Sequence, residues 1–259
     1  MAARAIWKGV IRLGGTAVPV KLYSAVENRS IHFRLLHETD LVPVEQRMIH
    51  PATGEAVAYE ETRRGVETER GIVVLDEEEL DALEPEKSRD IEVLRFVPPE
   101  DLDHRWYLRP YWLGPDESGA AYASLVEALS ARDLEGVVRW TMRNKEYHGA
   151  LRVREQRLLL VTLRHAAEVV SVEELEAPSG RDLQGPEAEM ADRLVDALAG
   201  EWNPEDHRDE YRERVLELVE AKESGKVVAF EPVEREAPKG SLEEALAASL
   251  ERVGGSARA

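Results

Sequence analysis

The stretch RWTMRNKEYHGALRVREQRLLLVTLR, residues 139–164, decides how the rest of the sequence is interpreted. It contains seven Arg and Lys residues but two Glu, in a chain of 259 residues whose formal net charge is −18. Its apolar and polar residues alternate with the period of a β-strand, so that successive side chains face opposite sides of a sheet. The stretch therefore predicts neighbouring strands with one apolar face and one basic face.

The basic face of these strands is the first candidate binding surface. Apolar residues such as Trp140 and Leu151 occupy the alternate positions and predict a core on the reverse side. A solvated sheet surface is the common alternative, but the stretch offers few acidic residues to balance its cations. The predicted face consists of four arginines on the strands and one lysine in the turn between them: Arg139, Arg143, Arg152, Arg154 and Lys145.

Short β-type runs separated by turns continue outward from this stretch and dominate residues 5–163. Together they favour an α+β fold built on a sheet that closes or nearly closes into a barrel. The predicted strands are residues 5–13, 16–23, 31–36, 44–49, 71–75, 91–97, 137–142, 150–153 and 157–163.

Helical patterns interrupt and then replace the strands. Asp76 followed by Glu79 has the spacing of a capping box at the start of one helix, and residues 117–133 predict a second. After residue 166 the sequence becomes helical and acidic, and residues 171–259 carry 11 basic and 23 acidic side chains. We expect a β-barrel domain at residues 1–175, a helical arm at 176–231, and a linker with a short tail helix at 232–259.

The tail helix is a candidate partner-binding element. Ser241 and Glu244 form a capping box at its start. A helix this short is marginally stable alone in water, so its apolar stripe favours docking on another surface. The stripe consists of Leu242, Leu246 and Leu250.

Composition excludes several classes of protein. The chain has no cysteine, so disulfides, zinc–thiolate sites and cysteine nucleophiles are excluded, and a cytoplasmic, nucleoid-associated location is expected. No window approaches the roughly 20 apolar residues that a membrane span needs, so no membrane partner is expected.

Motifs for catalysis and cofactors are also lacking. Asp76 ends a strand-like run as a magnesium-binding carboxylate would, but no GxxxxGK[ST] loop accompanies it, so a helix cap is the better interpretation. Gly14 and Gly15 lack GxGxxG spacing and predict a hairpin turn. The seven histidines form no HExxH motif, and no GxSxG elbow is present. We therefore expect no catalytic residues, no metal and no cofactor.

Several segments, taken in order, resemble one known family. RAIWKGVIRLGGTAVPVKLYSAVE (4–27), HRWYLRPYWLGPDESGAAYASLVEAL (104–129) and the stretch at 139–164 are similar to the N-terminal and core strands of the prokaryotic Ku proteins. AGEWNPEDHRDEYRERVLELVEAKESGK (199–226) and SLEEALAASLE (241–251) resemble their C-terminal arm and tail helix. The resemblance covers nearly all of the chain.

The resemblance implies fold, function and partners. Ku proteins of this type bind double-stranded DNA ends in non-homologous end joining, as homodimers whose barrels and bridging loops form a ring. They are not enzymes and recruit an ATP-dependent ligase, ligase D. The stretch VEQRMIHPATGEAVAYEETRRGVE (44–67) resembles part of the bridge, here assigned to about residues 40–75. With the basic face above, the DNA-contacting candidates are Lys8, Arg12, Lys21, Arg47, Arg63 and Arg64.

Two departures from the family affect what is expected. Some members carry a cysteine pair in the segment matching residues 48–56, and this chain has none, so zinc is not expected there. Many end in a lysine-rich tail, whereas this chain ends VGGSARA, so DNA affinity is expected to depend on the ring.

Two other functional classes remain as alternatives. An acidic protein-interaction scaffold would use the arm and tail for partners and would not bind DNA. A hydrolase using Asp76 or dispersed histidines has no motif in its favour. DNA-binding and turnover assays separate the three hypotheses.

Overall fold

The computed structural model describes residues 4–116, 119–176, 185–226 and 246–250. The chain divides into two compact units, Met1–Glu174 and Leu175–Ala259. The first unit contains the predicted barrel, and the second contains the predicted arm and tail. The boundary predicted between arm and tail lies outside the described residues and stays a prediction.

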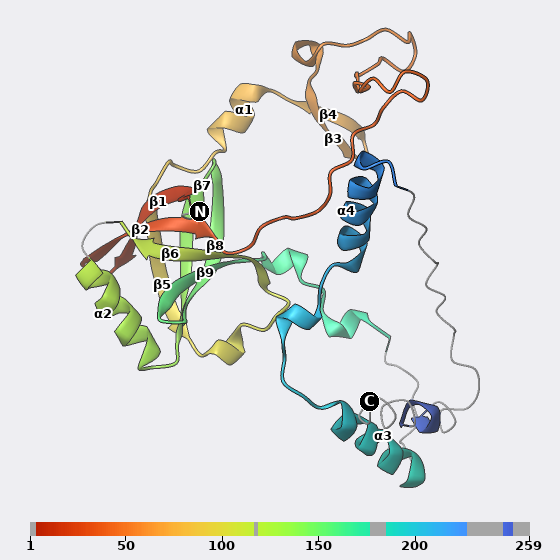
Figure 1. The fold of residues 1–259 in the computed structure, drawn as a ribbon. Coiled ribbons are helices and arrows are strands. Elements are labelled where there is room, and N and C mark those ends of the chain that lie inside the picture. The colour runs from red at the N-terminus through yellow and green to blue at the C-terminus, as the bar shows by residue number, and fades with distance from the viewer. Residues whose placement is uncertain (1–3, 117–118, 177–184, 227–245, 251–259) are drawn as a thin grey trace. The chain divides into compact units, whose positions relative to one another are not determined.

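Seven strands of the first unit form a closed barrel in the order β1-β2-β6-β9-β8-β7-β5 (Figure 1). The closing pair, β1 and β5, is parallel, and the other pairs are antiparallel. Closure gives each of these seven strands a paired neighbour on both sides. The strands are β1 Trp7–Leu13, β2 Thr16–Ser24, β5 Asp90–Val97, β6 Tyr107–Pro115, β7 Glu135–Met142, β8 Lys145–Arg154 and β9 Arg157–Leu163.

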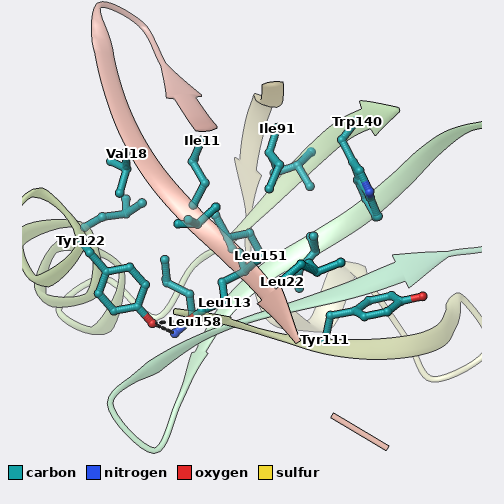
Figure 2. Packing of buried hydrophobic residues seen from close by; sticks show 14 of the residues in the cluster. Ile11, Val18, Leu22, Ile91, Tyr111, Leu113, Tyr122, Trp140, Leu151 and Leu158 are labelled. Atoms are coloured by element: carbon teal, nitrogen blue, oxygen red, sulfur yellow. Dashed lines mark hydrogen bonds between the residues drawn. The ribbon is translucent and has the colours of Figure 1, made fainter. Parts of the chain in front are cut away.

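The barrel interior is filled by the alternate apolar residues of these strands (Figure 2). Helix α2, Gly119–Ser130, packs against this core through four buried residues: Tyr122, Leu125, Val126 and Leu129. The Tyr122 hydroxyl donates to the carbonyl of Leu113 at 2.6 Å and accepts from the amide of Leu158 at 2.9 Å. The helix therefore joins the barrel by apolar packing and by two hydrogen bonds to strand backbone.

Strand β6 lies between β2 and β9 but was not among the predicted strands. Pro110 lacks the amide hydrogen that a central strand needs, which is why its segment does not read as a strand. The structure accommodates it with a register shift between Tyr107 and Pro110. There the Thr162 hydroxyl accepts from the amide of Arg109 at 2.9 Å and donates to its carbonyl at 3.2 Å. A side chain thus replaces ladder hydrogen bonds at the irregular position.

The connection between β2 and β5, residues 25–89, contains the predicted bridge segment. It carries η1 Tyr59–Glu61, the hairpin of β3 Arg64–Thr68 and β4 Gly71–Leu75, and helix α1 Glu77–Ala82. The capping box at α1 is confirmed, with the amide of Asp76 donating to Glu79 at 3.0 Å. The predicted strands at 31–36 and 44–49 are wrong, because each contributes a single isolated bridge, at Leu36 and Ile49.

The second unit is helical where it is described. Its elements are α3 Gly185–Leu198, η5 Pro204–Asp206 and α4 Glu210–Glu223. The first unit also contains the short 3-10 helices η2 Pro99–Asp101, η3 Ala166–Glu168 and η4 Val172–Glu174. Asn203 caps η5, and Asp209 caps α4 by accepting from the amide of Arg212 at 2.9 Å. No helix within the described ranges is long and apolar enough to span a membrane.

Candidate nucleic-acid interface

The alternation predicted for β7 is confirmed by burial, whereas on β8 Gly149, Ala150 and Leu151 are all buried. Val138 and Trp140 point into the core, whereas Arg139 lies on the outer face beside His148 of β8. Arg152 and Arg154 are at alternate positions of β8 from His148 and therefore belong to the same outer face. Arg143, however, is not on the strand, because β7 ends at Met142, and Lys145, predicted in the turn, begins β8.

Arg152 forms a buried ion pair. Its side chain is 17% exposed and donates to Glu135, which is 5% exposed, at 2.8 Å. It also donates to the Tyr107 hydroxyl, and its guanidinium lies 4.5 Å from the centre of the Tyr107 ring. Burial, and then the charge of Glu135, raises the pKa of Tyr107. Contact with a phosphate would require Arg152 to leave Glu135 unpaired inside the wall, which is costly.

Arg12 and Arg139 meet in one pocket on the outer wall, across β1, β5 and β7. Arg139 lies 2.7 Å from Glu92 and 4.0 Å from Glu146, and Arg12 lies 3.1 Å from Asp90. The hydrogen bond to Glu92 raises the pKa of Arg139. Four carboxylates surround two guanidinium groups in this pocket of about 400 Å³, which is lined by Arg12, Glu86, Asp90, Glu92, Arg139 and Glu146, among others. The pocket is therefore acidic in sum.

Lys8 and Lys21 share a single acidic partner. They oppose each other on β1 and β2, and their Nζ atoms lie 3.0 Å and 2.7 Å from Oδ1 of Asp116. The hydrogen bonds from Lys21 and Lys8 lower the pKa of Asp116, and the same contact raises the pKa of Lys21. One carboxylate against two ammonium groups leaves this site with a net positive charge.

The remaining candidates are exposed and are not neutralised by close ion pairs. Arg63 donates to the carbonyls of Glu60 and Thr62, and Arg47 is 73% exposed with Glu45 at 3.9 Å. Four others make no ion pair with any carboxylate in the part of the chain that the structure describes: Arg64, Arg143, Lys145 and Arg154. The structure thus divides the predicted cations into three groups. Arg152 is buried, and four others are paired with carboxylates: Lys8, Lys21, Arg12 and Arg139. The unpaired set makes no ion pair in the described residues and consists of Arg63, Arg64, Arg143, Lys145 and Arg154, with Arg47 loosely paired.

The unpaired cations of β8 lie at its two ends. Arg143 and Asn144, with φ of 54° and 60°, form the two-residue turn before it, and Glu155 and Gln156, with φ of 49° and 59°, form the turn after it. Two consecutive positive φ angles are typical of the type I′ turn. β8 is ten residues long, so its ends lie about 30 Å apart at the usual rise of a strand. The unpaired cations of the predicted face therefore lie in two separate places, with Arg143 and Lys145 at one end of β8 and Arg154 at the other.

Sequence reasoning did not predict the acidic partners of the paired cations on the barrel wall, which are Lys8, Arg12, Lys21 and Arg139. Glu92 is 47 residues from Arg139, and Asp116 is 108 residues from Lys8, so no local pattern links them. The alternation of Asp90, Ile91 and Glu92 was a usable signal, because it places two acids on the outer face of β5. In the described residues, no group of three or more His, Asp or Glu could hold a metal ion.

The tail candidates are only partly described. Leu246 and Leu250 lie in helical residues 246–250 and are half-buried, whereas Leu242 lies outside the described residues. Partner binding by these leucines stays a prediction.

Comparison with known proteins identifies the family. A family model described as the Ku70/Ku80 beta-barrel domain matches residues 12–192. "Non-homologous end joining protein Ku 2" of Geotalea uraniireducens is 37% identical over 231 residues, covering 89% of this chain and 90% of the relative. Proteins named "Non-homologous end joining protein Ku" are 34% identical in Coxiella burnetii over 242 residues (90% and 88%) and in Pseudomonas aeruginosa over 245 residues (92% and 84%). With a closed barrel and matches over most of its length, the chain belongs to the Ku family, alongside the bacterial Ku proteins named for non-homologous end joining.

Proposed function

We propose that this protein binds the ends of double-stranded DNA, without sequence preference, in the repair of breaks by non-homologous end joining. The observation that carries the proposal, beside family membership, is the set of exposed, unpaired cations on a chain of net charge −18. A cation that already has an acidic partner gains less binding free energy from contact with a phosphate. The unpaired set is therefore the phosphate-binding surface: Arg63, Arg64, Arg143, Lys145 and Arg154, with Arg47 loosely paired.

The protein acts as a homodimer, and the β2–β5 connection supports this. Fifteen large apolar side chains between residues 26 and 83 are exposed, among them Phe33, Ile49 and Ile72. The β3–β4 hairpin is a two-stranded sheet to which no other described segment adds a strand, and all of β3 is exposed. Such a hairpin is marginal alone in water. A second copy of the chain gives these residues a partner, and two copies close a ring.

A ring that accepts any broken end needs contacts that ignore base identity. Contacts to phosphates position a protein on a duplex but carry no sequence information. Arginine is suited to such contacts because its planar guanidinium can bind phosphate oxygens in pairs. The unpaired arginines fit this requirement, whereas the acidic pocket around Arg12 and Arg139 does not.

The protein itself performs no chemistry and recruits an ATP-dependent ligase, ligase D, to the bound end. The tail helix is the docking element, because its stripe at Leu242, Leu246 and Leu250 needs an apolar partner surface. Substitution of Leu246 by Asp should abolish stimulation of end joining by the ligase while DNA binding stays unchanged. Loss of DNA binding in this variant would assign the tail to the dimer instead.

Competition between linear and circular DNA tests the function. We expect binding to linear duplex and much weaker binding to covalently closed circles of equal length. The logarithm of affinity should fall with the logarithm of salt concentration by about 0.9 per phosphate contact. Equal binding to circles would exclude threading onto ends. No binding at moderate salt would favour the acidic scaffold, a function with which the carboxylates around Arg139 are consistent.

A further inference from the structure

A side-chain hydrogen bond joins the turn before β8 to the end of the β2–β5 connection. The Asn144 amide nitrogen donates to a carboxylate oxygen of Glu84 at 2.9 Å, between residues 60 apart in sequence. Glu84 lies two residues after the end of α1 and precedes the return of the chain to β5. The bond therefore links the barrel to the connection that carries the hairpin.

The turn that carries Asn144 fixes the position of its neighbours. A two-residue turn paired from Met142 to Lys145 leaves little freedom to Arg143 and Lys145. Asn144 has φ of 60°, a conformation that asparagine adopts more readily than most residues. Asn144 can thus hold Glu84 while its two neighbours, both exposed and without an acidic partner in the described chain, remain available to a ligand.

The chain after Glu84 is held at two points with a cavity between them. The carbonyl of Arg89 accepts from the amide of Val10 at 2.8 Å, which fixes the far end to β1. Between these points, Pro85, Glu86 and Ser88 line the pocket of about 400 Å³ against the barrel wall. This segment is therefore not packed tightly on the wall, and the contact of Asn144 with Glu84 holds its near end.

We propose that Asn144 and Glu84 are positioning residues that hold the β7–β8 turn against the base of the connection and so present Arg143 and Lys145 to the DNA backbone. The inference rests on the proposed DNA binding and adds to it a link between the barrel cations and the connection. Neither residue touches DNA in this scheme. Asn144 is in the turn but acts through Arg143 and Lys145, and Glu84 acts through Asn144.

The test exchanges the two functional groups. Asn144→Asp places a carboxylate opposite Glu84 and breaks the hydrogen bond, while aspartate still tolerates the turn conformation. Glu84→Gln keeps an acceptor for Asn144. The double variant N144D/E84Q restores the bond in the opposite sense, with the amide of residue 84 donating, and has the same net charge as the original protein.

The readout is affinity for linear duplex and its salt dependence, measured on the full-length dimer. For Asn144→Asp we expect an affinity decrease of about two- to tenfold, the range that an ordinary hydrogen bond supports. We also expect a shallower salt dependence, by about 0.9 for each phosphate that the variant no longer binds. Glu84→Gln should not weaken binding, and the double variant should return to within about twofold of the original affinity.

Gln156→Asp is the matched control. It adds the same charge at the equivalent position of the turn after β8, where φ is 59°, beside Arg154. It therefore measures the effect of the added charge alone and should weaken binding less than Asn144→Asp does. The positioning role is overturned if Asn144→Asp binds as the original does, if Gln156→Asp weakens binding equally, or if the double variant stays as weak as Asn144→Asp. Failure of the original protein to prefer linear DNA would instead overturn the proposed function. Unchanged thermal unfolding of each variant shows that the barrel is intact.

Discussion

The barrel and the β2–β5 connection use apolar residues in opposite ways. Ile11, Leu22 and Leu151 of the barrel are 0% exposed, whereas Ile72 of the connection is 74% exposed. Closure explains the difference, because seven strands that pair all round enclose an interior, and a lone two-stranded hairpin has none. The barrel therefore carries its own stability, whereas the connection leaves its apolar side chains exposed.

The largest effect is expected from a cavity in the barrel core. Leu151→Ala removes a fully buried side chain and should lower the free energy of unfolding by about 2–5 kcal/mol. The loss of buried apolar surface and the cavity that remains both contribute to this decrease. The matched variant Ile72→Ala removes mostly exposed surface and should leave barrel unfolding nearly unchanged. Urea titration followed by circular dichroism measures both.

Equal destabilisation by the two variants would break the comparison, since it would mean that the hairpin is packed in the folded monomer. Ile72→Ala is also expected to weaken the dimer. Sedimentation at a series of protein concentrations separates this association effect from the stability of the barrel.

The second prediction sharpens the comparison within the barrel wall, between its buried and exposed ion pairs. Glu135→Ala leaves Arg152 charged and enclosed, and should cost about 3 kcal/mol of unfolding free energy. Glu92→Ala leaves Arg139 charged but open to water, and should have a far smaller effect. Denaturant titration of the two variants tests this order, and a larger decrease in stability for Glu92→Ala would contradict it.

Local patterns predicted the barrel strands that alternate cleanly, such as β2 and β7, and the helices that begin with a cap or carry an apolar stripe. They failed where tertiary structure decides the outcome. Strand β6 was not predicted because Pro110 lacks an amide hydrogen. The Thr162 hydroxyl replaces the missing ladder hydrogen bonds beside it, but Thr162 is 52 positions away in sequence. Runs 31–36 and 44–49 have strand-like composition, yet the structure gives them no neighbouring strand.

The candidate site shows the same limit. Periodicity placed Arg139 on the outer face correctly, but it could not show that Glu92 of β5 opposes it, or that Glu135 encloses Arg152. Such partners are set by which strands become neighbours on closure of the barrel. Side-chain direction is thus a local property, whereas the charge balance of a surface is a property of the whole fold.

The third prediction compares the two turns that flank β8. Arg143 holds a left-handed backbone that favours glycine, asparagine and aspartate, so Arg143→Asn should raise the free energy of unfolding by about 0.5–1 kcal/mol. It should also weaken DNA binding and reduce the salt slope by about 0.9 per protomer. Glu155→Asn, with φ of 49° at the equivalent position, should stabilise the barrel similarly. It should not weaken DNA binding, because it removes an acid beside Arg154 and no cation.

Thermal unfolding together with DNA titration at several salt concentrations measures both consequences. Arg143→Asn with undiminished DNA affinity would remove the turn before β8 from the phosphate-binding surface. Weaker binding by Glu155→Asn would show that a change of turn residue, and not loss of the Arg143 cation, lowers the affinity.

The smallest effect is expected at Asp116, where the wall cations can be released from their acid. Hydrogen bonds from Lys21 and Lys8 hold the pKa of Asp116 below its usual value, so the carboxylate stabilises the fold above the unfolded pKa, near 4. This contribution disappears as pH falls through the lower, folded pKa. Asp116→Asn should therefore be slightly less stable than the original at neutral pH, and the difference should vanish in acid.

The DNA affinity of the same variant shows whether Lys8 and Lys21, which are paired with Asp116, contact DNA as the unpaired cations are proposed to do. Asp116→Asn frees Lys8 and Lys21 without moving the strands that carry them. If these lysines face the duplex, affinity at low salt should increase and the salt slope should steepen, since two more ammonium groups can replace condensed counterions. If affinity is unchanged, Asp116 pairs with lysines that lie away from the DNA, and the phosphate contacts belong to the turns and the connection.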